Sequence, residues 1–209
     1  QFHLWVIEGP KSVKEEFPSE VCGLNVVFTD NQEPYRTRKV RILNGAHTSL
    51  VPVGYLYGID RVRESLEDKV VGQFLKDTLF NNICPTLDLP EEELSQFSAD
   101  VLDRFRNPYL EHELMSISLN SISKYKTRVL PSVLEFIKRK EALPMNLLFS
   151  LASLITFYKG DRNGTAIALK DDAKVLDFFK NVWSTNNISE VAEKTLSNTD
   201  FWGTDLTKI

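Results

Sequence analysis

The sequence has few of the residues that mark the commoner metal and redox sites. Its 209 residues include two cysteines, Cys22 and Cys84, and three histidines. The cysteines have neither a C-x-x-C spacing nor a Cys/His pattern, so neither a zinc site nor a disulfide framework is indicated. We therefore expect no bound metal, and a reducing compartment, the cytoplasm, as the natural location.

A hydrophobic run long enough to cross a membrane is also missing. The most apolar stretch, MNLLFSLASLITFY at residues 145–158, contains an asparagine and two serines. It is shorter than the roughly 20 residues that a membrane-spanning helix needs. The stretch predicts a buried helix, and no membrane partner is expected.

Charge of one sign is not in large excess. The chain has 25 basic and 29 acidic residues, a net charge of −4, and its basic residues are scattered rather than arranged in a stripe. This distribution argues against nucleic acid as a partner. A small anionic ligand remains possible, because it needs only a few local cations.

The sequence lacks the usual phosphate-binding and nucleophile motifs. It contains no G-x-G-x-x-G, no Walker-type loop and no G-x-S-x-G. Gly54 and Gly58 form a G-x-x-x-G, which in a soluble helix indicates close packing. These residues alone therefore do not predict a nucleotide site or a serine hydrolase.

What the chain does contain is a short β part followed by helices. Residues 2–9 (FHLWVIEG) and 22–30 (CGLNVVFTD) predict two strands that can pair. From about residue 35 the apolar spacing becomes helical. It predicts about eight helices, a mostly α fold, over residues 36–58, 65–81, 90–105, 110–123, 131–140, 144–158, 171–184 and 188–198.

Two isolated strands are marginal in water, so the β part needs further strands. We expect residues 1–34 to be a β segment that belongs to, or links to, an N-terminal domain missing from this chain. Residues 35–209 are expected to form the helical C-terminal domain.

The candidate catalytic residues lie in residues 39–58, KVRILNGAHTSLVPVGYLYG. At about 100° per residue, Asn44 lies about 140° and His47 about 80° round a helix from Lys39, so the three share one broad face. A ketone held there would meet an ammonium, an amide that stabilises negative charge on oxygen, and an imidazole. The structural alternative is a solvated lysine and a core histidine, and periodicity does not decide between the two readings.

The same stretch resembles the K-x-x-x-x-N-G-x-H segment of the long-chain mannitol dehydrogenase family, a group of metal-independent, nicotinamide-dependent polyol and hexuronate dehydrogenases. The similarity continues in RFRNPYLEHELMSISLNSISKYKTRVLP (104–131), in LITFYKG and in FWGTDL. It is greatest to the members that interconvert D-tagaturonate and D-altronate.

The resemblance implies a two-domain enzyme. An N-terminal Rossmann-like domain, absent here, binds NAD and holds the cofactor-binding residues. The present chain would be the mostly helical C-terminal domain, of the type found at the C-terminus of 6-phosphogluconate dehydrogenase, packed against that N-terminal domain. The chain alone is then expected to be inactive.

The resemblance also implies roles for the motif residues. Lys39 matches the family's general acid/base, Asn44 matches an asparagine that helps stabilise the oxyanion, and His47 matches a histidine that binds substrate.

A further substrate-contacting lysine of the polyol-acting members matches Lys124. Where those members have an arginine eight residues earlier, this sequence has Ser116, which favours a hexuronate over a polyol. Lys126 and Arg128 are then candidates to bind the carboxylate, since arginine can do so with two parallel hydrogen bonds. The alternative is that both are solvated cations at a helix end.

Two other functions stay open at this stage. The parent protein could act on a related substrate, such as fructuronate or mannitol. Alternatively, the helical chain could be an interaction domain without activity.

Overall fold

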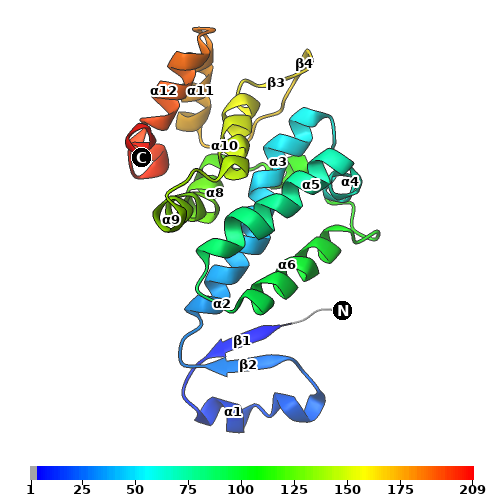
Figure 1. Ribbon diagram of the computed structural model, residues 1–209. Coiled ribbons are helices and arrows are strands. Elements are labelled where there is room, and N and C mark those ends of the chain that lie inside the picture. The colour runs from blue at the N-terminus through cyan, green and yellow to red at the C-terminus, as the bar shows by residue number, and fades with distance from the viewer. Residues whose placement is uncertain (1–3) are drawn as a thin grey trace.

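The computed structural model describes residues 4–209, and it places a small β unit below a larger helical part (Figure 1). The strands are β1 (Trp5–Glu8), β2 (Val26–Thr29), β3 (Asp161–Arg162) and β4 (Thr165–Ala166). The α-helices are α1 (Ser12–Glu16), α2 (Glu33–Arg38), α3 (Gly45–Tyr57), α4 (Val62–Glu67), α5 (Lys69–Asp77), α6 (Glu91–Phe105), α7 (Leu114–Ile117), α8 (Ser121–Arg128), α9 (Leu130–Lys140), α10 (Met145–Phe157), α11 (Ala173–Trp183), α12 (Ile188–Leu196) and α13 (Thr199–Trp202). The other helical turns are η1 (Ser19–Cys22), η2 (Lys39–Asn44), η3 (Thr78–Ile83), η4 (Cys84–Thr86) and η5 (Leu206–Lys208). The prediction of a mostly α fold with a short β segment is confirmed.

The β unit is a parallel pair, β1 and β2, with Trp5 opposite Val26 and Glu8 opposite Thr29. Parallel strands need a crossover connection, which α1 and η1 supply on one side of the pair (Figure 1). Both predicted strands are present, although Phe2 and His3 lie outside the described residues. The Trp5 side chain remains 57% exposed, so the unit covers little of its own apolar surface. The assignment of the β unit to a further, N-terminal domain stays a prediction.

The first predicted helix runs without interruption through α2, η2 and α3. Its middle segment, η2, is a π-helix, and residue 45 continues in right-handed helical geometry. The helix ends at Gly58, whose φ of 116° is accessible to glycine and strained for other residues. The apolar spacing predicted neither the π segment nor the start of the helix at Glu33, before residue 36.

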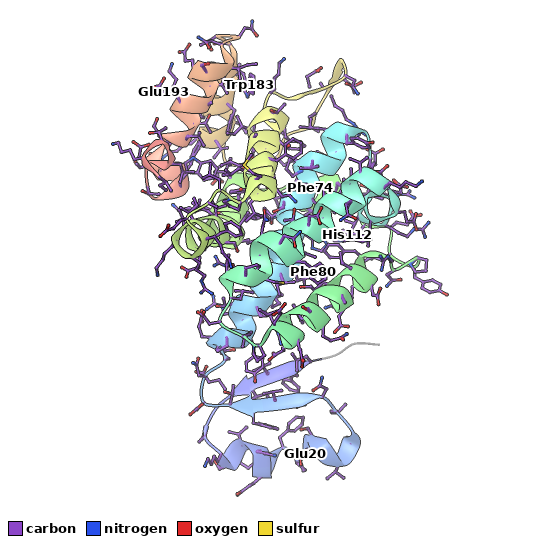
Figure 2. The ribbon with its side chains drawn as sticks, in the orientation of Figure 1. Glu20, Phe74, Phe80, His112, Trp183 and Glu193 are labelled. Atoms are coloured by element: carbon purple, nitrogen blue, oxygen red, sulfur yellow. The ribbon has the colours of Figure 1, made fainter. Side chains whose placement is uncertain are left out.

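The helix α3 is the centre of the helical part. It packs against α10, α8, α7 and α5, and side chains fill the space between these helices (Figure 2). Leu50 of α3 and Leu147 of α10 are fully buried. Each such leucine contributes about 1.5–3 kcal/mol by its removal from water. This packing fixes the position of η2, which continues α3 towards the β unit.

Two predicted helices are divided differently in the structure. Residues 65–81 are interrupted at Asp68, whose carboxylate accepts hydrogen bonds from the backbone N–H groups of Val70 and Val71 and begins α5. Residues 110–123 contain only α7 and the start of α8, because Asn120 takes a left-handed conformation with φ 53°. The helix in this region continues to Arg128 instead, so Lys124, Lys126 and Arg128 are helical.

The remaining predicted helices agree with α6, α9, α10, α11 and α12 to within a few residues. The last helices are held by aromatic contacts: Phe178 meets Phe201 edge-on with ring centroids 4.9 Å apart, and the Trp202 indole donates to the Thr195 carbonyl at 2.7 Å. Within residues 4–209, no helix has the length and apolar character needed to cross a membrane.

Candidate functional site

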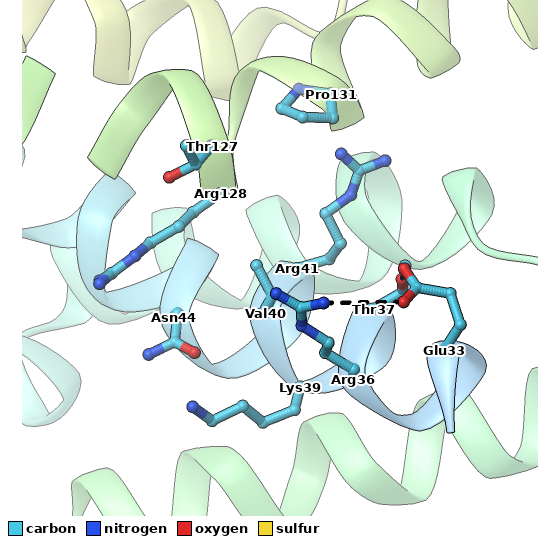
Figure 3. A pocket seen from close by; sticks show the side chains of 10 residues that line it. All are labelled: Glu33, Arg36, Thr37, Lys39, Val40, Arg41, Asn44, Thr127, Arg128 and Pro131. Atoms are coloured by element: carbon cyan, nitrogen blue, oxygen red, sulfur yellow. Dashed lines mark hydrogen bonds and ion pairs between the residues drawn. The ribbon is translucent and has the colours of Figure 1, made fainter. Parts of the chain in front are cut away.

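A cavity of about 590 Å³ lies between η2 and the end of α8 (Figure 3). Its wall contains Lys39 and Asn44 from the predicted catalytic motif, and Arg128 from the predicted substrate-binding segment. The structure thus brings together three predicted residues that are up to 89 positions apart in the sequence, counting from 39 to 128.

The π-helical turn explains how Lys39 and Asn44 come to share this cavity. In a π-helix the hydrogen bonds join residues five apart, so residues i and i+5 lie nearer to one face than they do in an α-helix. Lys39 and Asn44 are the first and last residues of η2 and have this spacing. An ordinary α-helix would have placed them about 140° apart. Short π segments are frequent at functional sites, and this one aligns two polar side chains.

Gly45 allows α8 to come close to the same turn. A Cβ atom at this position would lie 3.2 Å from the Arg128 carbonyl oxygen, closer than ordinary van der Waals contact. The absence of a side chain at Gly45 therefore lets the end of α8 approach η2 and brings Arg128 beside Asn44 (Figure 3). This gives a physical reason for the N-G pair within the motif.

The side chains of Lys39, Asn44 and Arg128 share a further property. Within residues 4–209, none of the three has a hydrogen bond or an ion pair with another residue. Lys39 is exposed and the other two are partly buried. An ammonium, an amide and a guanidinium therefore point hydrogen-bond donors into one cavity without protein acceptors. Such a cavity suits a ligand that brings oxygen acceptors and negative charge.

The helix α8 separates the three predicted substrate-binding cations. Lys124 and Arg128 are four residues apart and share one face, whereas Lys126 lies about 200° round the helix from Lys124. Lys126 points to the C-terminal part, with its Nζ 3.4 Å from the Asp200 carbonyl oxygen. Lys124 donates to the Ile117 carbonyl at 2.8 Å. Burial lowers the pKa of Lys124, the positive charge of Arg128 lowers it further, and Asp171 opposes both. Neither lysine is among the residues lining the cavity.

His47 occupies a neighbouring cavity of about 290 Å³, beyond Leu43. Its ring stacks on Phe105 with centroids 4.0 Å apart and meets His112, labelled in Figure 2, edge-on at 5.1 Å. Its Nε2 is buried and makes no hydrogen bond within the described residues. Burial, followed by the charges of His112, Arg128 and Arg104, lowers the pKa of His47 to about 3. The imidazole is therefore neutral near neutral pH.

The low pKa of His47 predicts acid-sensitive stability. Because the unfolded imidazole, with a pKa of 6.5, binds a proton more readily than the folded one, the stabilising contribution is complete above pH 6.5 and is lost as pH falls towards 3. The free energy of unfolding should fall by up to about 1.4 kcal/mol per pH unit in this window. Urea unfolding at several pH values measures this, and His47→Gln should flatten the profile. A profile of the same slope in wild type and His47→Gln would contradict the prediction. Burial also lowers the pKa of the neighbouring His112, so His112→Gln should flatten the profile too, but less than His47→Gln does.

Three arginines near the motif were not predicted from the sequence. Arg36 and Arg41 line the cavity, and Arg38 is buried and lines a second cavity together with Arg36 and Lys39. The Arg38 guanidinium pairs with Glu93 of α6 and lies 4.5 Å from the Phe97 ring centroid. This contact anchors α6 to the residue directly before Lys39. The signal for Arg36 and Arg41 was their proximity to Lys39 in the sequence.

No group of three or more His, Cys, Asp or Glu side chains that could hold a metal ion occurs within the part of the chain that the structure describes. Cys22 and Cys84 are both free thiols. Burial raises the pKa of the Cys84 thiol, and a hydrogen-bond contact with Ser98 at 3.2 Å partly opposes this shift.

Solved structures of two dehydrogenases share this fold. The chain matches a ternary complex of Pseudomonas fluorescens mannitol 2-dehydrogenase with NAD and D-mannitol, with a TM-score of 0.77 and 22% identity over 89% of this chain and 37% of that one. It matches a substrate-free D-sorbitol dehydrogenase with a TM-score of 0.72 and 19% identity, over 96% of this chain and 46% of that one. At these identities the similarity establishes the fold alone.

Two curated proteins are more similar to this chain in sequence than these two solved structures are. The chain is 45% identical over its whole length to altronate oxidoreductase of Phocaeicola vulgatus and 44% identical to altronate oxidoreductase of Yersinia pestis. It spans 44% of the length of each of these proteins. The family model of the mannitol dehydrogenase C-terminal domain matches residues 31–209. The chain therefore belongs to the mannitol dehydrogenase family, as a C-terminal domain of that family.

Proposed function

We propose that this chain is the C-terminal part of a two-domain altronate oxidoreductase, or tagaturonate reductase, that interconverts D-altronate and D-tagaturonate with NAD. The observation that carries the proposal is the cavity into which Lys39, Asn44 and Arg128 direct donors that have no partner within residues 4–209. The names of the relatives support the substrate pair, and the NAD complex of the mannitol dehydrogenase supports the cofactor.

The residues of this chain alone do not fit a dinucleotide. The sequence has no glycine-rich phosphate loop, and the described β unit has two strands where a dinucleotide fold has several. We therefore propose that a Rossmann-like domain preceding this chain holds NAD, extends the β1–β2 pair and packs on the helical domain. When bound, the cofactor carries the hydride. The residues described here act on the oxygen and its proton.

Lys39 and Asn44 can share the chemistry at the reacting oxygen. In the direction of alcohol oxidation, the neutral Lys39 amine accepts the hydroxyl proton; in the direction of ketone reduction, its ammonium returns that proton. The Asn44 amide donates a hydrogen bond to the same oxygen and stabilises the negative charge that develops there. An ammonium and an amide suffice for these steps, so we propose that no metal takes part.

We propose that Lys39 faces a second domain. It lines the 590 Å³ cavity and also a cavity of about 330 Å³ between β1 and the helical part, to which Val6 and Leu43 contribute. Its side chain is exposed on this chain. We propose that the preceding domain covers it, which would exclude water from the reacting atoms. The chain by itself should then show no turnover.

His47 lies one turn beyond Leu43 on the same face of the helix as Lys39. Its neutral imidazole can still contact a substrate that extends past Leu43, as the family resemblance implies. Lys124 can contribute only after it leaves the Ile117 carbonyl. Ser116, where polyol-acting members have an arginine, is exposed and donates to the carbonyl of Glu113 at 2.7 Å.

A substrate comparison tests the proposed function. The full-length protein, assayed with NADH and a chelator, should reduce D-tagaturonate faster than D-fructuronate and far faster than fructose. The cytoplasmic location that we propose agrees with a supply of NADH. Faster reduction of fructuronate would identify the full-length protein as another hexuronate reductase. Faster reduction of fructose would identify it as a polyol dehydrogenase. Absence of turnover with all three would leave the helical domain a non-catalytic interaction module.

A further inference from the structure

The residues that line the cavity at η2 include more positively charged than negatively charged side chains. Arg36, Lys39, Arg41 and Arg128 line it, and Glu33 is the only carboxylate among the lining residues. Such an imbalance attracts an anion and raises its local concentration. The question is which of the cations would bind the carboxylate of a sugar acid.

Two of these cations are directed elsewhere. Arg36 is 72% exposed and lies 3.9 Å from Glu33, at the outer edge of the cavity. Arg41 extends towards Pro131, away from Lys39 (Figure 3). Burial lowers the pKa of Arg41 to about 10, and the nearby Glu135 carboxylate acts in the opposite direction. Arg41 thus already has a negative charge in its vicinity.

Arg128 differs from Arg36 by its burial, and from Arg41 because Glu135 acts on the Arg41 guanidinium whereas no carboxylate of the described residues acts on that of Arg128. It is partly buried, burial lowers its pKa, and no carboxylate within residues 4–209 pairs with it. In Figure 3 its side chain descends from α8 on the same side of the cavity as the Asn44 amide and the Lys39 ammonium. Its charge also contributes to the lowered pKa of Lys124 and of His47. A guanidinium removed from water without a counter-ion is unfavourable until an anion binds.

We propose that Arg128 binds the carboxylate of the substrate and is the residue that makes this site select a sugar acid over a neutral sugar. The inference rests on the proposed function, which places the reacting carbonyl at Lys39 and Asn44. A six-carbon chain then extends from η2 to α8, with its carboxylate against the planar guanidinium. Two parallel hydrogen bonds can form there, which a lysine cannot reproduce. Lys126, the other candidate from the sequence, is held at the Asp200 carbonyl on a different face of α8.

The test compares Arg128→Met, Arg128→Lys and Lys126→Met in the full-length protein. Arg128→Met should raise KM for D-tagaturonate about 10- to 100-fold, because hydrogen bonds to a charged partner contribute about that factor. Arg128→Lys should give a smaller rise. KM for NADH should stay within about twofold of wild type, and slow reduction of fructose should not decline. Arg106→Met, at an exposed arginine paired with Asp103, is the matched control and should change neither KM.

Several results would overturn the proposal. One is an unchanged KM for D-tagaturonate in Arg128→Met. Another is a rise in KM for NADH with no rise in KM for D-tagaturonate, which would assign Arg128 to a cofactor phosphate. The third is a larger rise in KM for D-tagaturonate in Lys126→Met than in Arg128→Met.

Binding of D-altronate measured by calorimetry separates this inference from the proposed reaction. Affinity that depends on Arg128 in a protein without turnover would retain the carboxylate site and reject the reaction. Turnover of uronates that does not change when Arg128 is replaced would retain the proposed reaction and reject the carboxylate site.

Discussion

Replacement of Lys39 by alanine in the full-length protein is expected to lower kcat for D-tagaturonate reduction by about 10³-fold, the middle of the range for loss of a general acid. The variant retains the η2 backbone and the cavity, so the far-ultraviolet circular dichroism should not change. NADH oxidation measured by absorbance gives kcat. Near-normal turnover would rule out Lys39 as the proton donor.

The exposure of Lys39 provides a second readout. Because its side chain projects into a cavity of about 590 Å³, alanine at this position leaves room for a small primary amine. Added methylamine should therefore restore part of the turnover of Lys39→Ala, and the restored rate should follow the concentration of the amine. Lys194→Met is the matched control, because Lys194 is an exposed helical lysine that pairs with Glu190 on α12. It should behave as wild type with and without the amine.

The sequence was sufficient to predict most helices because their apolar faces are regular. Residues 91–105, which begin after Pro90 with three glutamates in the first turn, form α6 as expected. The prediction was wrong for residues 110–123, where Asn120 takes a left-handed conformation that no apolar pattern reports. The observed helix, α8, sets the directions of Lys126 and Arg128. Because the prediction ended the helix at residue 123, it could not show which of the two cations faces the cavity.

The arrangement of the site depended on features that a sequence pattern does not contain. Ile42 and Ala46 are four residues apart and buried, the spacing of an ordinary α-helix, so the apolar pattern does not report the π turn that brings Lys39 and Asn44 towards one face. Burial of Arg38 follows from its pairing with Glu93, which lies 55 positions further on. Pairings between distant segments set these details, whereas the helices themselves follow from local spacing.

Replacement of Asn44 by alanine is expected to lower kcat by about 10²- to 10³-fold, the usual cost of removing one hydrogen-bond donor from an oxyanion site. Its amide has no protein partner within residues 4–209, so its loss leaves no orphaned group and the stability should change little. Because an amide does not titrate, Asn44→Ala should keep the pH profile of kcat. Asn81→Ala, at an exposed asparagine near Asp77, is the matched control. Turnover of Asn44→Ala within about twofold of wild type would remove Asn44 from the oxyanion site, and the alignment by η2 would then need another explanation.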